Sequence, residues 1–132
     1  MKKIAMKVLA LMLVLLTLST GAVAEMVTPR ASDIFESAYV SLSADKVVTA
    51  SVTTFREHAT VRILTGWVEY EDDDGWHWCA DIPELFAEVH DWMKVSSQCS
   101  VADRIGTGTY RVGVTFMCDG LYINRYSGEV TY

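Results

Sequence analysis

The stretch of sequence richest in reactive side chains is EDDDGWHWC, from Glu71 to Cys79. It combines four acidic residues with one glycine, two tryptophans, a histidine and a cysteine. Carboxylates bind hard cations such as calcium, histidine and cysteine bind zinc, and flat indole rings pack against ligands. These three kinds of chemistry require different surroundings, so the elements that flank the stretch decide between them.

The acidic run lacks the frame of a calcium-binding loop. An EF-hand places its ligands at alternate positions between two helices, with a glycine and a bidentate glutamate at fixed offsets. The five carboxylates of the run do not follow that spacing: Glu69, Glu71, Asp72, Asp73 and Asp74. A solvated hairpin tip explains an acidic run more simply. We therefore predict no metal at this position.

A zinc site is the second possibility. His77 and Cys79 are two residues apart, so on a strand they point to the same face. His90, Cys99 or Cys118 could complete a tetrahedral set. The spacing matches neither a CxxC pair nor an HExxH helix, and a disulfide or a buried thiol is the simpler role for these cysteines. We predict no metal and no cofactor.

Nucleophilic catalysis requires a cysteine or serine beside a histidine that a third group orients. The chain has three cysteines and three histidines, but no GxSxG elbow and no papain-type cysteine context. We predict no catalytic residue and no enzymatic activity. The alternative, a small secreted hydrolase or metal-dependent enzyme, would gather histidine, cysteine or serine, and carboxylate in one cleft.

The aromatic side chains are the candidate ligand-binding residues. Alternation along a strand places Trp76 and Trp78 on one face, with Trp67 and Tyr70 on the other arm of the hairpin. The candidates are Trp76, Trp78 and Tyr70. Burial is the dominant use of large aromatic residues, so we expect the two tryptophans to face the core or line its rim. Exposure of both would instead favour a binding surface.

The N-terminus has the pattern of a secretory signal peptide. Lys2, Lys3 and Lys7 precede an apolar run that ends in Ala22-Val23-Ala24, which predicts cleavage before Glu25. The apolar run, Val8 to Leu18, is shorter than the roughly 20 residues that span a bilayer. We expect a secreted, extracellular protein without a stable membrane anchor after cleavage.

The expected organisation is a signal peptide at 1–24, a polar, loosely ordered lead-in at 25–37 and one domain at 38–132. Loss of three signal lysines changes the formal net charge from −6 to −9. This acidic balance, without a cluster of Lys or Arg, argues against nucleic acid and anionic membranes as partners.

The cysteines are odd in number: Cys79, Cys99 and Cys118. One internal disulfide at most can form, and the sequence does not choose among the three pairings. The remaining thiol is either buried or available for a disulfide-linked homodimer.

Strand-like runs alternate with turn residues along most of the chain. The expected strands cover residues 38–43, 46–55, 60–70, 76–80, 95–105, 110–118 and 121–132. Asp74-Gly75 and Asp119-Gly120 mark turns between them. Tyr110 opens a strand after a glycine turn, as in the tyrosine corner of immunoglobulin-like domains. We predict a mainly β fold, an antiparallel β-sandwich of the immunoglobulin or fibronectin type.

One segment has a helical pattern. Asp81 and Glu84 have the spacing of a capping box around Pro83. One helix face would carry Leu85, Phe86, Val89, Trp92 and Met93. This pattern predicts one short helix around residues 82–94 that closes an end of the core, or alternatively binds a partner.

The chain resembles a family of uncharacterised small secreted β-rich proteins of Gram-positive anaerobes, especially Clostridia. The residues that carry the resemblance are Ala31-Ser32-Asp33, Asp74-Gly75 followed by Trp78, and GTYRVGVTF from Gly108 to Phe116. The resemblance implies secretion and a β-sandwich; it brings no activity, cofactor or catalytic residue with it. We expect a non-enzymatic extracellular module that binds a protein, a glycan or a cell-wall component.

Overall fold

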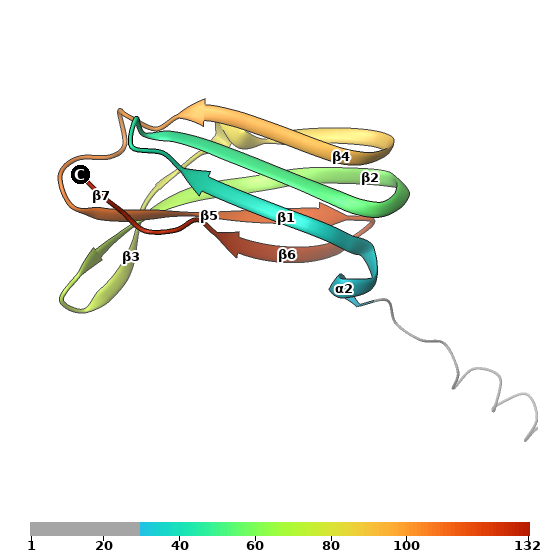
Figure 1. Ribbon diagram of the computed structural model, residues 1–132, viewed down its shortest axis with the longest axis horizontal. Coiled ribbons are helices and arrows are strands. Elements are labelled where there is room, and N and C mark those ends of the chain that lie inside the picture. The colour runs from blue at the N-terminus through green and yellow to red at the C-terminus, as the bar shows by residue number, and fades with distance from the viewer. Residues whose placement is uncertain (1–29) are drawn as a thin grey trace, which may run out of the picture.

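The structure is a computed structural model that describes residues 30–132 (Figure 1). The signal peptide expected at 1–24 lies outside these residues, as does the lead-in up to residue 29. Within residues 30–132, no helix has the length and apolar character needed to span a membrane.

The described residues form a mainly β structure with two short helical turns. In chain order the elements are α2 (Ala31–Ile34), β1 (Phe35–Leu42), β2 (Val47–Asp72), β3 (Gly75–Asp81), the 3-10 helix η1 (Pro83–Leu85), β4 (Ala87–Ser100), β5 (Thr109–Cys118), β6 (Leu121–Tyr126) and β7 (Val130–Thr131). Every strand pair is antiparallel. The predicted mainly β, antiparallel class is confirmed. All seven strands belong to one hydrogen-bonded sheet instead of two separate sheets.

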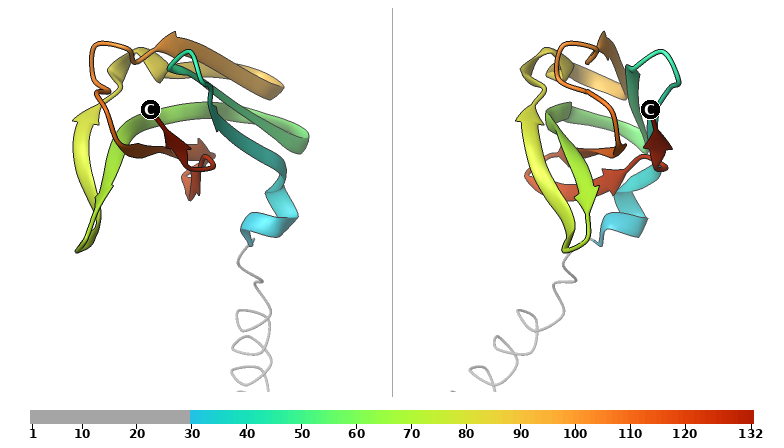
Figure 2. Two further views of the ribbon diagram at one scale, coloured as in Figure 1. Left: turned by 60° about the vertical axis from the view of Figure 1, so that its left-hand side comes forward. Right: turned by 90° about the vertical axis from the view of Figure 1, so that its left-hand side faces the viewer.

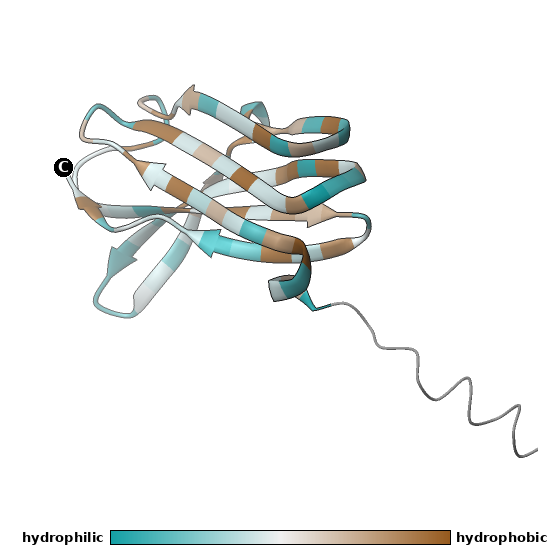
Figure 3. Ribbon diagram, turned by 45° about the vertical axis from the view of Figure 1, so that its right-hand side comes forward, coloured by the Kyte–Doolittle hydropathy of each residue, from teal (hydrophilic) through white to brown (hydrophobic). Residues whose placement is uncertain are grey.

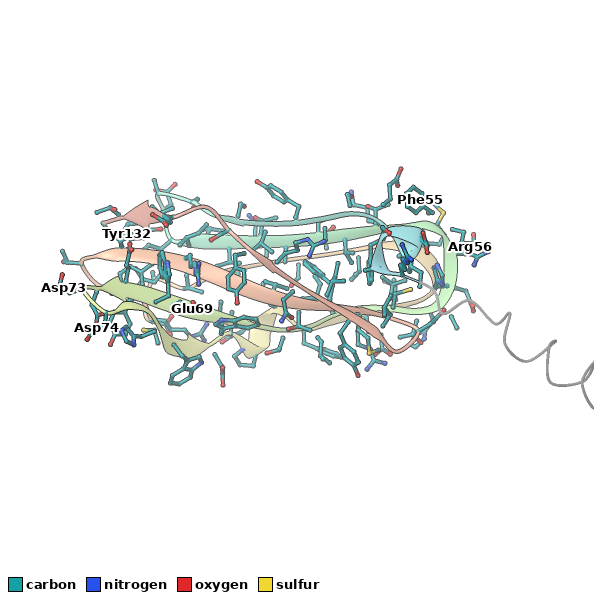
Figure 4. The ribbon with its side chains drawn as sticks, turned by 90° about the horizontal axis from the view of Figure 1, so that it is seen from below. Phe55, Arg56, Glu69, Asp73, Asp74 and Tyr132 are labelled. Atoms are coloured by element: carbon teal, nitrogen blue, oxygen red, sulfur yellow. The ribbon has the colours of Figure 1, made fainter. Side chains whose placement is uncertain are left out.

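Strand β2 organises this sheet because it reverses direction partway along its length. Its first part pairs with β1 and with the end of β4, and its second part pairs with β3, β5 and the start of β4. The register shifts between Thr53 and His58, where the ribbon turns back and places Phe55 and Arg56 at one end of the molecule (Figures 1 and 4). The sheet therefore folds over itself (Figure 2).

Two neighbouring bends are tied together at this end, here termed the arch end (Thr53–His58 and Asp91–Lys94). The buried hydroxyl of Thr54 lies 2.7 Å from the carbonyl oxygen of Arg56 and 3.2 Å from that of Met93. Asp91 in β4 adopts a φ of 51°, in the left-handed region. A single buried donor thus serves the bends of both β2 and β4.

The core fills the space between the folded-over parts of the sheet. Apolar and polar residues alternate along the strands, which gives each strand one core-facing side (Figure 3). The fully buried side chains include Val48, Val52, Val61, Ile63, Val68, Val112, Val114 and Phe116. Strand β1 packs against β5 and β6 without hydrogen-bonding to them, so the core is covered on both sides.

The helix predicted around residues 82–94 is confirmed only as the single turn η1 (Pro83–Leu85), and the prediction is wrong for the remainder. Residues from Ala87 onward form β4, because hydrogen bonding to the edge of β2 satisfies their backbone. In β4, Val89 lies opposite the buried Val61. Three residues of the expected helix face, Phe86, Trp92 and Met93, are exposed. The apolar residues at helical spacing therefore do not form the buried face of a helix.

The beginning of the domain is ordered earlier than expected. Ala31–Ile34 forms α2, and β1 begins at Phe35, which is buried in the core. The comparison of Tyr110 with a tyrosine corner has a structural counterpart. The backbone N–H of Gly106 donates a hydrogen bond of 3.2 Å to the Tyr110 hydroxyl, four residues downstream.

The Tyr110→Phe substitution tests this contact. We expect the free energy of unfolding to fall by about 1 kcal/mol, because a partly buried N–H loses its acceptor. The measurement is urea denaturation of the folded domain. Tyr39, whose side chain is 57% exposed, provides the control: Tyr39→Phe is expected to leave the denaturation midpoint unchanged. Equal effects of the two substitutions on the denaturation midpoint would contradict a stabilising hydrogen bond to the Tyr110 hydroxyl.

Candidate functional site

The acidic run forms the tip of the β2–β3 hairpin. Asp72 lies opposite Gly75, which adopts a φ of 114° that favours glycine. The Asp72 carboxylate accepts a hydrogen bond of 2.8 Å from the Asp74 backbone N–H and lies 2.7 Å from Nε2 of His77. These two hydrogen bonds hold the pKa of Asp72 below its usual range, and the bond from Asp74 has the larger effect. The carboxylates therefore shape a turn, as predicted for a hairpin tip.

Trp76 and Trp78 lie on the outer side of this hairpin. Trp78 lies opposite Glu69 and Trp76 opposite Glu71, and residues opposite each other share a face of the sheet. The Trp78 side chain is 61% exposed and its Nε1–H donates a 3.0 Å hydrogen bond to Asp81. The expectation that the two tryptophans face the core or line its rim is therefore wrong for Trp78, whereas Trp76 is half-buried.

Trp76 is held by an arginine. The guanidinium carbon of Arg111 lies 4.3 Å from the centroid of the Trp76 ring and 4.4 Å from that of the Tyr126 ring. The cation is thus sandwiched between two aromatic faces from β3 and β6. Each such contact contributes about 0.5–2 kcal/mol, and more as water is excluded. The sandwich fixes the orientation of both rings.

A nearly buried carboxylate completes this arrangement. Glu69 accepts hydrogen bonds from Nη2 and Nε of Arg111, at 2.8 and 3.2 Å, and from Nε1 of Trp67 at 2.6 Å. The Glu69 side chain is only 12% exposed. A carboxylate with so little water contact requires these donors. Glu69 therefore locks the arginine and one indole in place; Figure 4 labels it on the face seen from below.

Room for the Trp67 indole exists because residue 113 is a glycine. A Cβ atom at Gly113 would lie 2.4 Å from Cε2 and Cζ2 of Trp67. The Trp67 ring also meets the Tyr126 ring edge to face, with centroids 5.9 Å apart. We term the outer surface formed by these residues the aromatic face: Trp67, Glu69, Trp76, Trp78, Arg111 and Tyr126.

The third predicted ligand-binding residue lies elsewhere. Tyr70 is opposite His77 on the other side of the hairpin, and their rings are 5.3 Å apart. A register shift between Val68 and Glu69 accommodates the extra residue of β3. The structure therefore brings Trp76 and Trp78 together and separates Tyr70 from them. Sequence reasoning missed Arg111, Glu69 and Tyr126, whose contacts join strands far apart in the chain.

A second exposed apolar surface lies at the arch end. It contains Phe55, Trp92 and Met93, and Trp92 is 60% exposed. A pocket of about 260 Å³ lies beside it, lined by Thr53, Glu57, Trp92, Met93 and Lys94. The sequence did not predict this surface because its β4 residues were assigned to a helix.

The same end of the molecule contains a cluster of potential ligand atoms from His58, Cys118 and Asp119, which all lie within 4.8 Å of one another. Nδ1 of His58 lies 2.9 Å from Asp119. Burial raises the pKa of Asp119, but hydrogen bonds from His58 and from the Thr60 backbone N–H, with the charge of His58, outweigh it and lower the pKa overall. No other such group of three occurs within residues 30–132.

This cluster has the composition of a cysteine–histidine–aspartate triad but not its reactivity. The Cys118 side chain is completely buried. Burial first, and the charge of Asp119 second, raise the pKa of the thiol to about 11. A nucleophilic cysteine has the opposite properties, a lowered pKa and access to substrate. The arrangement does not support attack on a substrate by Cys118.

The three cysteines are free thiols in the structure. Cys79 donates a weak 3.6 Å hydrogen bond to the carbonyl oxygen of Arg104. Burial raises the pKa of Cys99, with a further contribution from Glu84. His77, Cys79 and His90 do not gather into a zinc site among the described residues.

Comparison of the chain with models of protein families, with curated proteins and with solved structures finds no match.

The Gly113→Ala substitution tests the packing of the aromatic face. We expect the free energy of unfolding to fall by about 1–3 kcal/mol, because the new methyl group displaces the Trp67 indole from Glu69. Gly128→Ala is the matched control, since a Cβ at Gly128 meets nothing within 4 Å. Urea denaturation of both variants measures the difference. Equal stability of the two variants would refute the close contact.

The order of cysteine alkylation tests the reactivity of Cys118. In native protein treated with iodoacetamide at pH 8, we expect Cys118 to remain unmodified while Cys79 reacts, because the thiolate is the attacking species. Peptide mass spectrometry identifies the modified residues, and unfolded protein is the control in which all three react. Preferential modification of Cys118 would instead indicate an activated nucleophile.

Proposed function

We propose that the protein is a secreted, non-enzymatic binding module whose aromatic face binds a neutral glycan. The observation that carries this proposal is the joint position of Trp76 and Trp78 on the outer side of β3. One indole is exposed, and the other is fixed against Arg111. A contiguous exposed aromatic surface on a small domain is typical of a binding site.

Secretion is supported by sequence features. These are the basic start, the apolar run and the Ala22-Val23-Ala24 site, together with the resemblance to small secreted proteins of Clostridia. An extracellular module meets cell-wall polysaccharides and other glycans directly. A secreted protein is therefore exposed to the class of ligand that we propose for it.

The chemistry of the aromatic face favours a sugar over a protein partner. Indole and phenol faces pack against the C–H face of a sugar ring, and carboxylates accept hydrogen bonds from its hydroxyl groups. Asp81 and Glu71 lie beside the two indoles. The aromatic face contains no aliphatic side chain, and a stable protein interface requires roughly 800 Å² on each partner. Beyond Tyr70, which pairs with Tyr110 of β5, the hairpin that carries Trp76 continues as a two-stranded ribbon (Figure 2).

Charge favours a neutral ligand. The one cation of the aromatic face, Arg111, is already paired with Glu69 and covered by two rings. The neighbouring hairpin tip is acidic, from Glu71 to Asp74. An anionic ligand would thus meet repulsion without a free cation to offset it. Little ordering is needed on binding, because hydrogen bonds already hold Trp67 and Trp78, and Arg111 holds Trp76.

The alternative of a small hydrolase has weaker support. Its best candidate residues are Cys118, His58 and Asp119, and the sulfur is buried with a raised pKa. A binding role requires no such chemistry. We therefore propose a module without catalytic residues or cofactor for this function.

The test is retention on a panel of insoluble and soluble polysaccharides and purified cell wall, with the mature chain from residue 25. We expect binding to at least one neutral polysaccharide. Trp78→Ala should weaken it about tenfold, which corresponds to about 1.4 kcal/mol. Trp92→Ala is the matched control, because Trp92 is similarly exposed at the opposite end of the molecule.

Three outcomes would contradict the proposal. If the protein is retained on none of the polysaccharides, glycans are excluded as its ligand. Binding that Trp92→Ala abolishes and Trp78→Ala leaves intact transfers the site to the arch end. Capture of a protein from cell wall through Trp78, without any glycan binding, identifies a protein partner instead.

A further inference from the structure

A histidine at the arch end is buried without a full set of partners. The side chain of His58 is only 9% exposed. Its Nδ1 pairs with Asp119, but its Nε2 is buried and has no hydrogen-bond partner in the structure. A buried polar atom without a partner is uncommon and costs free energy. The nitrogen that faces Asp119, and is therefore placed to act as a ligand beside it, is Nδ1.

The residues around His58 are ligands for a transition metal. Cys118 ends β5 and Asp119 begins the turn to β6, and their ligand atoms lie within 4.8 Å of each other and of His58. The Asp119 backbone holds this turn against β2: its N–H donates to the carbonyl of Thr60 at 3.2 Å. The Thr60 N–H donates in return to the Asp119 carboxylate at 3.0 Å. The three side chains are thus fixed by the strand pairing around them.

We propose that His58, Cys118 and Asp119 bind one divalent transition-metal ion, with zinc as the best match. Imidazole nitrogen and thiolate sulfur are the ligands that zinc prefers, and a carboxylate oxygen commonly joins them. Calcium and magnesium require oxygen ligands and do not suit this set. This inference is independent of the glycan proposal, since the aromatic face shares no residue with the cluster.

The geometry is compatible with a tetrahedral ion. Zinc binds nitrogen and oxygen at about 2.0–2.2 Å and sulfur at about 2.3 Å, so its ligand atoms lie roughly 3–4 Å apart. Side-chain movements of about 1 Å would bring the three atoms into that range. Three protein ligands leave the fourth position for water. The Asp119 side chain is 39% exposed and gives the ion a path from solvent.

Binding is a ligand exchange without any oxidation or reduction. The Cys118 thiol loses its proton to solvent as the metal–sulfur bond forms, and the metal loses coordinated water molecules. His58 contributes a neutral nitrogen and Asp119 a carboxylate. The net result is one bound ion and one released proton.

The experiment is a titration of the reduced mature chain with Co²⁺, which takes zinc-type sites and reports a thiolate ligand by a near-ultraviolet charge-transfer band. We expect one equivalent of Co²⁺ to produce the band and one equivalent of Zn²⁺ to abolish it. His58→Gln should weaken Co²⁺ binding at least tenfold. Because Cys118→Ser alters the core, its folding is checked by circular dichroism; in folded protein the band should disappear.

His77→Gln and His90→Gln are the matched controls. Both histidines lie beside a carboxylate and are more exposed than His58, so they represent adventitious surface binding. We expect both variants to bind Co²⁺ as the natural chain does. Absence of a charge-transfer band, binding that His58→Gln leaves unchanged, or binding lost in a control variant would each overturn the proposal.

Discussion

The reversal of β2 between Thr53 and His58 is the constraint on which the other features of this structure depend. The strand pairs with β1, β3, β4 and β5, and the turn in its middle lets β1 pack against β5 and β6 across the core. Thr54 stabilises that turn because its buried hydroxyl bonds to the bends of β2 and β4 together. The turn places one part of β2 over the other and so creates the core.

The same reversal separates two different chemical environments. The aromatic face is built around Glu69 in the later part of β2, at the end where Asp73 and Asp74 lie (Figure 4). The cluster of His58, Cys118 and Asp119 is built where β2 leaves the bend. In each environment a carboxylate orients its neighbours: Glu69 holds Arg111 and Trp67, and Asp119 holds His58. Both carboxylates act through hydrogen bonds between strands.

Local patterns in the sequence predicted what depends on local physics. The turn residues Asp74-Gly75 and Asp119-Gly120 lie at hairpin turns, and alternation along β5 was predicted with its boundaries within a residue. The segment 82–94 failed because apolar residues at helical spacing also suit a bent strand with an exposed tip. Hydrogen bonding to the free edge of β2 selects the strand over the helix for this segment.

The composition of the sites depends on pairings that the sequence does not display. Arg111 meets Glu69 across 42 positions and His58 meets Asp119 across 61. The face of the sheet on which Trp76 and Trp78 lie depends on the register of β3 against β2. The sequence does not show this register. The preference of large aromatics for the core or its rim was wrong for the exposed Trp78, and the half-buried Trp76 packs against Arg111.

The central claim is that the outer aromatic face, not the apolar surface at the arch end, is the glycan-binding surface. The most direct measurement follows the indole N–H resonances of the four tryptophans by nuclear magnetic resonance while a retained polysaccharide fragment is added. The account predicts that the Trp76 and Trp78 resonances shift with one common affinity while Trp92 stays in place. A shift of Trp92 alone would contradict it.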